Sequence, residues 1–125
     1  MFEIVDSTIH VTRGDIGSID LSVKTSETEK LMFVAGDIIR FKVFQKKRPD
    51  KVIIQKDIKV VEDTTVVVIR LSGDETKIGE LISKPVDYWY EIERNPDTAP
   101  QTIVAYDRAT GPKIFRLYPE GGEIE

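Results

Sequence analysis

The sequence predicts an all-β fold, an antiparallel β-sandwich built from about seven to nine short strands. Apolar residues recur with period two along most of the chain, which is the spacing of a strand with one buried face. Polar residues, Gly or Pro interrupt this pattern about every ten residues, as is typical of a sandwich or barrel. A Gly-Asp corner followed by β-branched or aromatic residues occurs twice, at 13–16 and at 35–41. Glycine permits the positive φ of a tight corner and aspartate can bond its own backbone there, so both phrases predict the start of a strand.

The composition fits one globular domain. The chain has 125 residues, of which 40% are hydrophobic and 32% are charged. A domain of this size buries roughly two-thirds of the surface of its unfolded chain, which is enough for a core of its own. We expect a single sandwich domain over residues 1–118 and a flexible C-terminal tail over residues 119–125.

Residue counts also exclude several kinds of site and partner. The chain has no Cys and one His, so we expect neither a disulfide nor a metal site built on Cys and His clusters. Its 18 Lys and Arg stand against 22 Asp and Glu, and a net charge of −4 gains little from the phosphate attraction that dominates nucleic-acid binding. No segment approaches the ~20 apolar residues that span a bilayer, and the N-terminus lacks the features of a signal peptide. We therefore expect a protein made in the cytoplasm that binds neither nucleic acid nor membrane.

Alternation and turn residues place the individual strands. The predicted strands are 8–12, 16–24, 37–45, 51–60, 65–71, 86–94, 101–107 and 113–118. In the third of these, Ile39, Phe41 and Val43 alternate with Ile38, Arg40 and Lys42, so we expect one set to face the core and the other to face solvent or lie along a sheet edge. Residues 52–54 and 66–69 are nearly continuous in apolar character, which predicts central strands covered on both faces.

Turn residues also predict the connections between the strands. Residues 46–50 join two strongly β segments through a Pro-Asp turn, so strands 37–45 and 51–60 should form an antiparallel hairpin with a charged tip. Residues 74–82 predict one short helical turn crossing between the sheets, capped by Ser72 or Asp74 and stopped by Pro85. Asn-Pro-Asp and Thr-Gly-Pro sequences predict further turns at 95–97 and 110–112.

No motif predicts catalysis, a cofactor or a metal ion. His10 lies in a predicted strand without the nucleophile signature that a triad requires, so we expect a structural or surface role. Residues 14–17 lack the Lys-Ser/Thr and helix of a phosphate-binding loop. The acidic pairs at 62–63 and 74–75 lack the spacing of a calcium loop and are expected to be solvated turns. Residues 13–15 spell Arg-Gly-Asp, which a strand corner explains better than integrin binding.

Trp89 lies in an aromatic run whose alternation separates it from its neighbours. Tyr88, Tyr90 and Ile92 should share one face of the strand, with Trp89 and Glu91 on the other. If the first face is core, Trp89 is semi-exposed, where it packs under a loop or neighbouring side chain, forms part of a protein interface, or stacks on a sugar.

The hairpin tip is basic. Lys46, Lys47 and Arg48 follow one another, and Lys51 comes shortly after. Such a cluster is a solvated turn or an electrostatic docking site for an acidic partner. Together with Trp89, these three consecutive residues are our candidate partner-binding residues.

The order of these motifs resembles a known family. The corner at 12–15, the strand at 34–43, the Asp-Glu-Thr turn at 74–76 and the Tyr-x-Tyr-Glu-Ile strand at 88–92 are similar to those of the immunoglobulin-like domain at the N-terminus of phage baseplate upper proteins and related prophage tail proteins. The resemblance covers roughly residues 10–117.

This resemblance implies an immunoglobulin-like sandwich without enzymatic activity or cofactor. It further implies a virion protein, a tail baseplate or tail-fibre module that binds other tail proteins and copies of itself. The alternative is a carbohydrate-binding module that recognises a bacterial surface glycan with Trp89 as its stacking platform. A small hydrolase built on a carboxylate pair and a secreted adhesin domain are further alternatives.

Overall fold

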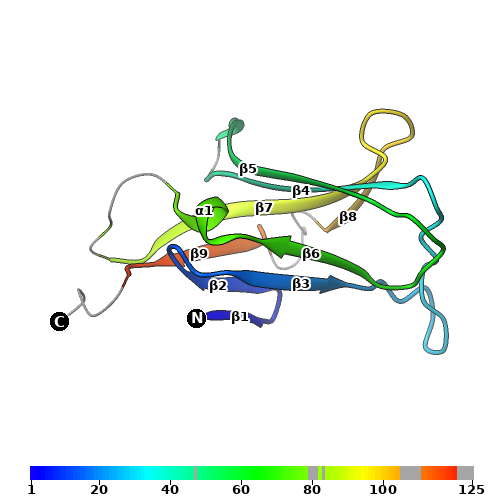
Figure 1. The fold of residues 1–125 in the computed structure, drawn as a ribbon, viewed down its shortest axis with the longest axis horizontal. Helices are drawn as coiled ribbons and strands as arrows, with labels where there is room; N and C mark the ends of the chain where they lie inside the picture. The colour runs from blue at the N-terminus through cyan, green and yellow to red at the C-terminus, as the bar shows by residue number, and fades with distance from the viewer. Residues whose placement is uncertain (47, 79–81, 83, 105–110, 121–125) are drawn as a thin grey trace.

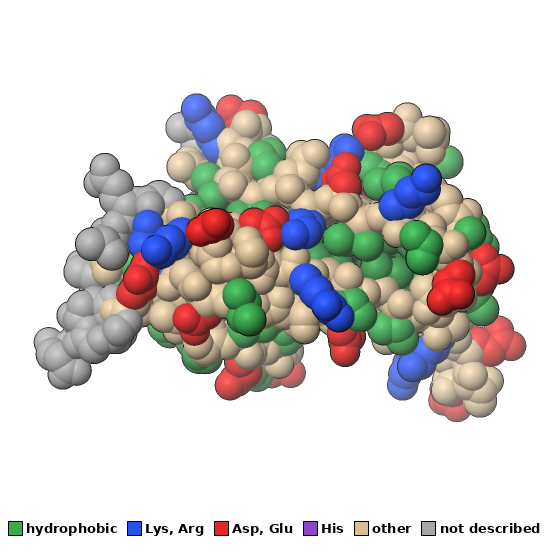
Figure 2. All heavy atoms as spheres, in the orientation of Figure 1, with side chains coloured by type: hydrophobic (Ala, Val, Ile, Leu, Met, Phe, Trp, Pro, Cys, Tyr) green, Lys and Arg blue, Asp and Glu red, His purple; other side chains and the backbone are tan. Residues whose placement is uncertain are grey.

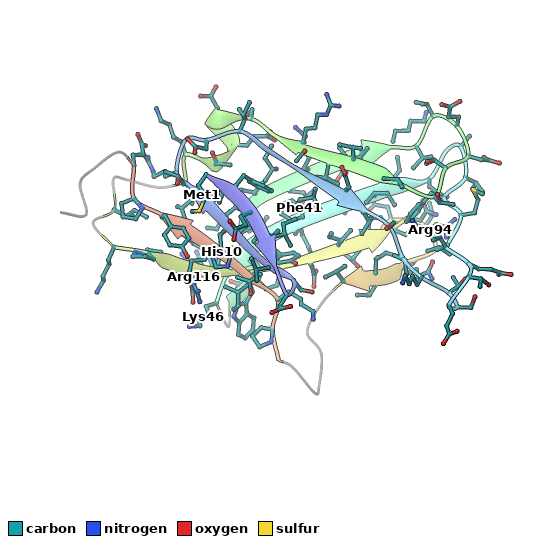
Figure 3. The ribbon with its side chains drawn as sticks, turned by 90° about the horizontal axis from the view of Figure 1, so that it is seen from below. Met1, His10, Phe41, Lys46, Arg94 and Arg116 are labelled. Atoms are coloured by element: carbon teal, nitrogen blue, oxygen red, sulfur yellow. The ribbon has the colours of Figure 1, made fainter. Side chains whose placement is uncertain are left out.

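The chain folds as a sandwich of two β-sheets, as predicted. The computed structural model describes residues 1–46, 48–78, 82, 84–104 and 111–120. Within these residues seven strands form a large sheet and two form a small sheet, and the views in Figures 1 and 3 place the small sheet over one face of the large one. The all-β class with one short helix is therefore confirmed.

The large sheet contains the first and last strands of the described residues. Its path runs in the order β1-β2-β9-β7-β4-β5, and β8 pairs with β7 beside this path. Its strands are β1 (Phe2–Val5), β2 (Thr8–Thr12), β4 (Ile38–Gln45), β5 (Arg48–Lys59), β7 (Val86–Arg94), β8 (Gln101–Val104) and β9 (Ile114–Tyr118). The small sheet pairs β3 (Gly17–Leu21) with β6 (Val67–Leu71), and α1 (Gly73–Thr76) follows it.

Core residues follow the predicted alternation. Ile39, Phe41 and Val43 of β4 are fully buried, and the β4–β5 pair is antiparallel as the hairpin prediction required. The predicted strands 8–12 and 86–94 coincide with β2 and β7. Strand 101–107 is confirmed as far as Val104, and its remaining residues lie outside the described part of the chain.

One pair of strands departs from the antiparallel prediction. β2 and β9 run parallel, with Ile9 opposite Phe115 and Thr12 opposite Tyr118. A tight hairpin imposes antiparallel pairing, whereas two strands from opposite ends of a chain are free to lie parallel. The prediction of a purely antiparallel sandwich was therefore wrong at this position.

The expected central position of two strands was also wrong. β5 ends the strand order of the large sheet, and β6 belongs to the two-stranded sheet. Val52, Val66 and Val68 are 42%, 38% and 38% exposed. In these two segments the continuous apolar runs therefore belong to strands with one exposed face, and not to strands that are buried on both faces.

The helix is shorter than predicted. Ser72 caps it, because its hydroxyl accepts the Glu75 N–H while the Glu75 side chain accepts the Ser72 N–H. The helix ends at Thr76 instead of residue 82, and residues 79–81 and 83 lie outside the described part of the chain. α1 lies where the chain passes from the small sheet to the large one, as expected.

The first Gly-Asp corner contacts residues at both ends of the described chain. Gly14 has a φ of +89°, and its N–H donates to Thr76 Oγ1 at 3.1 Å. The N-terminal ammonium forms an ion pair with Asp15, and Arg13 forms one with Glu120. Pro119 is buried as well, so the first two residues of the predicted tail are packed against the domain, and residues 121–125 lie outside the described chain.

The second corner contains a buried carboxylate. Asp37 is 6% exposed, and Gly36 before it has a φ of +98°. Arg94 Nη2 lies 2.7 Å from Asp37 Oδ2, and the Asn95 side chain donates to Oδ1 at 3.1 Å. The backbone N–H of Val34 donates to the same carboxylate at 2.9 Å. The predicted turn at 95–97 is present, while Thr110 of the turn at 110–112 lies outside the described residues.

Candidate functional site

Trp89 lies on the outer face of the large sheet, the face turned away from the small sheet. Tyr90 and Ile92 are 5% and 2% exposed and belong to the core, and Tyr88 packs against it. Trp89 therefore points to the opposite side, as the alternation predicted, and it is half-buried.

Trp89 and its cross-strand neighbours form an apolar row. Trp89 is opposite Phe44 on β4 and Ile114 on β9, and Phe44 is opposite Val52 on β5. Phe44 is only 7% exposed, yet it is not part of the core cluster between the sheets. We call Val52, Phe44, Trp89 and Ile114 the aromatic patch. It crosses four adjacent strands, and the pairing places its residues next to one another across the outer face.

An ion pair borders one side of the aromatic patch. Arg116 donates from Nε and Nη2 to the two oxygens of Asp87, at 2.7 and 3.1 Å. These hydrogen bonds hold the pKa of Asp87 below its ordinary value despite burial, and the positive charge of Lys46 acts in the same direction. The Asp87 carboxylate in turn raises the pKa of Arg116. Figure 3 shows Lys46 and Arg116 close together on the side away from the small sheet.

His10 belongs to the same border. Its Nδ1 shares a hydrogen bond of 2.7 Å with the Tyr118 hydroxyl, and the two rings lie 5.8 Å apart. His10 is half-buried and lies beside Arg116 in the register of β2 and β9.

Further ion pairs border the other side. Lys42 Nζ lies 3.1 Å from Glu91, and Arg40 binds Asp57 through Nε at 2.9 Å and Asp97 through Nη2 at 3.0 Å. Hydrogen bonds from Arg40 lower the pKa of Asp57. The outer face thus presents an apolar row between two borders of neutralised charge. A protein interface has the same composition, with an apolar centre and a polar rim.

The structure brings together two of the four candidate residues. Lys46 directly follows β4, the strand that neighbours the Trp89 strand, and it lies two residues beyond the Phe44–Trp89 pair at the same end of the sheet. Arg48 begins β5 opposite Gln45, and Lys47 lies outside the described residues.

Sequence reasoning missed the other members of this site. Phe44 and Ile114 follow from alternation, because Val43 and Phe115 face the core. The Asp87–Arg116 pair does not follow, because nothing in the sequence says that β7 lies beside β9.

The described residues contain no group of three or more His, Asp or Glu placed to hold a metal ion. The one helix in the described part of the chain is too short to cross a membrane.

Comparisons with protein-family models, with curated proteins and with solved structures give no match to this chain. The resemblance to phage baseplate proteins therefore stays a prediction.

Proposed function

We propose that this chain is a non-enzymatic structural protein of a phage or prophage tail. It acts as a baseplate or tail-fibre module and docks onto another virion protein through the outer face of its large sheet. The observation that carries the docking part is the aromatic patch, an apolar row over four strands with ion pairs on both sides. The motif resemblance supplies the virion context.

The composition of the patch suits a protein partner. Aromatic residues are enriched at the centres of interfaces, where truncating one of them costs the most binding energy. Trp89 occupies this central position, and Lys46 lies at the rim, where a charge steers association with an acidic partner.

Docking through the face is better supported than strand addition at the β5 edge. Lys56 is opposite Phe41 in register, so its side chain points towards the core side of this edge strand, where its Nζ binds Glu75 at 2.9 Å. The β4–β5 pairing also contains irregularities next to Phe44. Inward-pointing charges and bulges are features that protect sheet edges from pairing with other chains.

The test is incorporation into tail particles. Particles are purified from a lysate of the source strain after treatment with a DNA-damaging agent, and peptides of the chain are quantified by mass spectrometry. We expect the wild-type chain at a stoichiometry similar to that of other tail proteins. Trp89→Ala and Lys46→Glu chains, expressed in place of the wild type, should be incorporated about tenfold less, as expected for loss of an interface anchor or of a steering charge.

Matched controls separate docking from folding. Lys24→Glu changes an exposed Lys in the loop after β3 and should leave incorporation unchanged. Circular dichroism of each purified variant checks the fold, and Lys46→Glu keeps the test informative if Trp89→Ala unfolds, because Lys46 is exposed. Complete particles that lack the wild-type chain would overturn the virion proposal.

The glycan alternative has its own readout in the same variants. It requires that Trp89→Ala abolish binding to cell-wall glycan without changing the fold. The Lys46→Glu variant should bind the glycan like the wild type. The two carboxylates that flank Trp89 on its face, Asp87 and Glu91, already bind Arg116 and Lys42. The acceptors that would hold sugar hydroxyls are therefore occupied, which favours the protein partner.

A further inference from the structure

Two apolar side chains of the described chain are far more exposed than any other large one. Val61 is 82% exposed and Ile16 is 75% exposed, whereas the next, Met1, is 50% exposed. Ile16 precedes β3, and Val61 lies in the connection from β5 to β6. Figure 1 places the start of β3 and this connection at opposite ends of the molecule. Neither residue belongs to the aromatic patch.

Ile16 borders a hollow of about 480 Å³, which we call the Ile16 hollow. Its lining is Ile16, Gly17, Ser18, Lys56, Arg70, Leu71 and Ser72. Its walls come from β3, β5 and the end of β6, so it opens on the side of the small sheet. Figure 2 shows hydrophobic and basic side chains next to one another on this side.

The Ile16 hollow contains a cationic side chain that forms no ion pair within the described part of the chain. Lys56 is engaged by Glu75, but no ion pair with a described residue engages the exposed guanidinium of Arg70. Asp20 is on the same face of β3 and makes no ion pair with Arg70 within the described chain. The hollow therefore suits a ligand that combines an aliphatic group with a carboxylate.

The loop that contains Val61 offers this combination. Glu62 follows Val61 and is exposed, and no described cation forms an ion pair with it. Asp63, the next carboxylate, is held in place because it accepts the Ala35 N–H at 3.0 Å. Val61 and Glu62 thus expose an aliphatic side chain and a carboxylate without a described ion-pair partner, next to a residue that is hydrogen-bonded to Ala35.

We propose that Val61 and Glu62 of one copy bind in the Ile16 hollow of a second copy, with Glu62 pairing with Arg70. Because the two surfaces differ and lie at opposite ends, the contact is head-to-tail and leaves one free surface on each end of a pair. Such a contact repeats into a ring or a filament. It uses no residue of the aromatic patch, so it stands or falls independently of the docking proposal.

The test is a charge exchange followed by sedimentation velocity. We expect wild-type chain to pass from monomer to larger species between about 5 µM and about 1 mM, the range of a contact with modest affinity. Arg70→Glu alone and Glu62→Arg alone should stay monomeric, because hollow and loop then carry the same sign. An equimolar mixture should associate again, because each hollow meets a loop of opposite charge.

Controls match the size and sign of each change. Lys24→Glu and Glu27→Arg alter exposed charges that neither line the Ile16 hollow nor form part of the Val61–Glu62 pair, and these variants should associate like the wild type. A wild-type chain that is monomeric up to about 1 mM would overturn the proposal. So would association that persists in both single variants, which would assign self-association to another surface, or a mixture that stays monomeric.

Discussion

Asp37 is a charged residue whose burial is matched by its partners. Burial opposes ionisation, but hydrogen bonds from Val34, Asn95 and Arg94 outweigh it and lower the pKa of Asp37. Arg94 also lies over the Phe33 ring, 5.5 Å from its centroid. The carboxylate therefore ties the second Gly-Asp corner to the end of β7.

Replacing Asp37 with Ala should lower the free energy of unfolding by about 3 kcal/mol or more, because Arg94 is left mostly buried without its counter-ion. Urea denaturation followed by circular dichroism measures this loss. Asp97→Ala is the matched control. Its carboxylate pairs with Arg40 but is 75% exposed, so the loss should stay within about 1 kcal/mol. Equal losses in the two variants would contradict the assigned role of Asp37.

Stability should also fall in acid. Asp37, Asp57, Glu75 and Asp87 all have lowered pKa values in the folded chain. The unfolded chain therefore takes up protons first, so the stabilisation is complete above the ordinary carboxyl pKa of about 4 and is lost as pH falls through the lower folded values. Urea midpoints between neutral pH and about pH 2 should show this decrease. Asp37→Asn should flatten the curve, and an unchanged slope would exclude Asp37 as a contributor.

At the scale of elements, β1 is the strand that sequence reasoning missed. Its two-residue turn to β2 consists of Asp6 and Ser7, with φ values of 48° and 69°. This is the backbone of a tight hairpin, which Asn-Gly or Asp-Gly normally signals. Without the glycine, the turn carries no recognisable signature, although the Tyr90 hydroxyl stabilises it by donating to the Ser7 carbonyl.

Gly17 should be required for the packing of β1 on β3. A Cβ at this position would collide with the Phe2 ring. Gly17→Ala should therefore lower the free energy of unfolding by about 1–3 kcal/mol, the usual cost of overpacking.

A double-mutant cycle isolates this contact. Phe2→Ala removes the ring, so Gly17→Ala added to it should cost nothing further in urea denaturation. Additive losses would show that the glycine is needed for its backbone instead.

The side of a strand on which each side chain lies was predictable from the sequence, whereas the order of the strands in the sheet was not. Alternation correctly sent Trp89 to one side of β7 and Tyr90 to the other, because side-chain direction depends only on local backbone. The aromatic patch depends on the order β9-β7-β4-β5, which is set by packing between distant segments. The apolar runs at 52–54 and 66–69 misled for the same reason, since composition does not reveal which face a second sheet covers.

At the scale of the whole molecule, the fold class followed from the period-two spacing of apolar residues and from the turn residues between them. The two Gly-Asp corners are present as predicted. The parallel β2–β9 pair did not follow, because it joins the two ends of the chain. No short motif describes a contact between such distant residues.

This long-range pairing predicts slow folding. The β2–β9 pair joins segments from the start and the end of the described chain, and all-β sandwiches rich in such non-local contacts fold in milliseconds to seconds. Stopped-flow refolding, followed by the fluorescence of Trp89, the only Trp, should show this range. Refolding that is complete within the dead time of mixing would contradict the prediction.

The parallel pair also determines how the domain responds to tension. If the two ends are pulled apart, β1 peels from β2 one residue at a time, because an antiparallel hairpin opens like a zipper. β2 and β9 are then loaded from opposite ends, so the force acts along the strands and stretches all of their ladder bonds together. Rupture in this geometry requires simultaneous failure of four paired positions, and a link of this kind holds its load up to a threshold instead of yielding gradually.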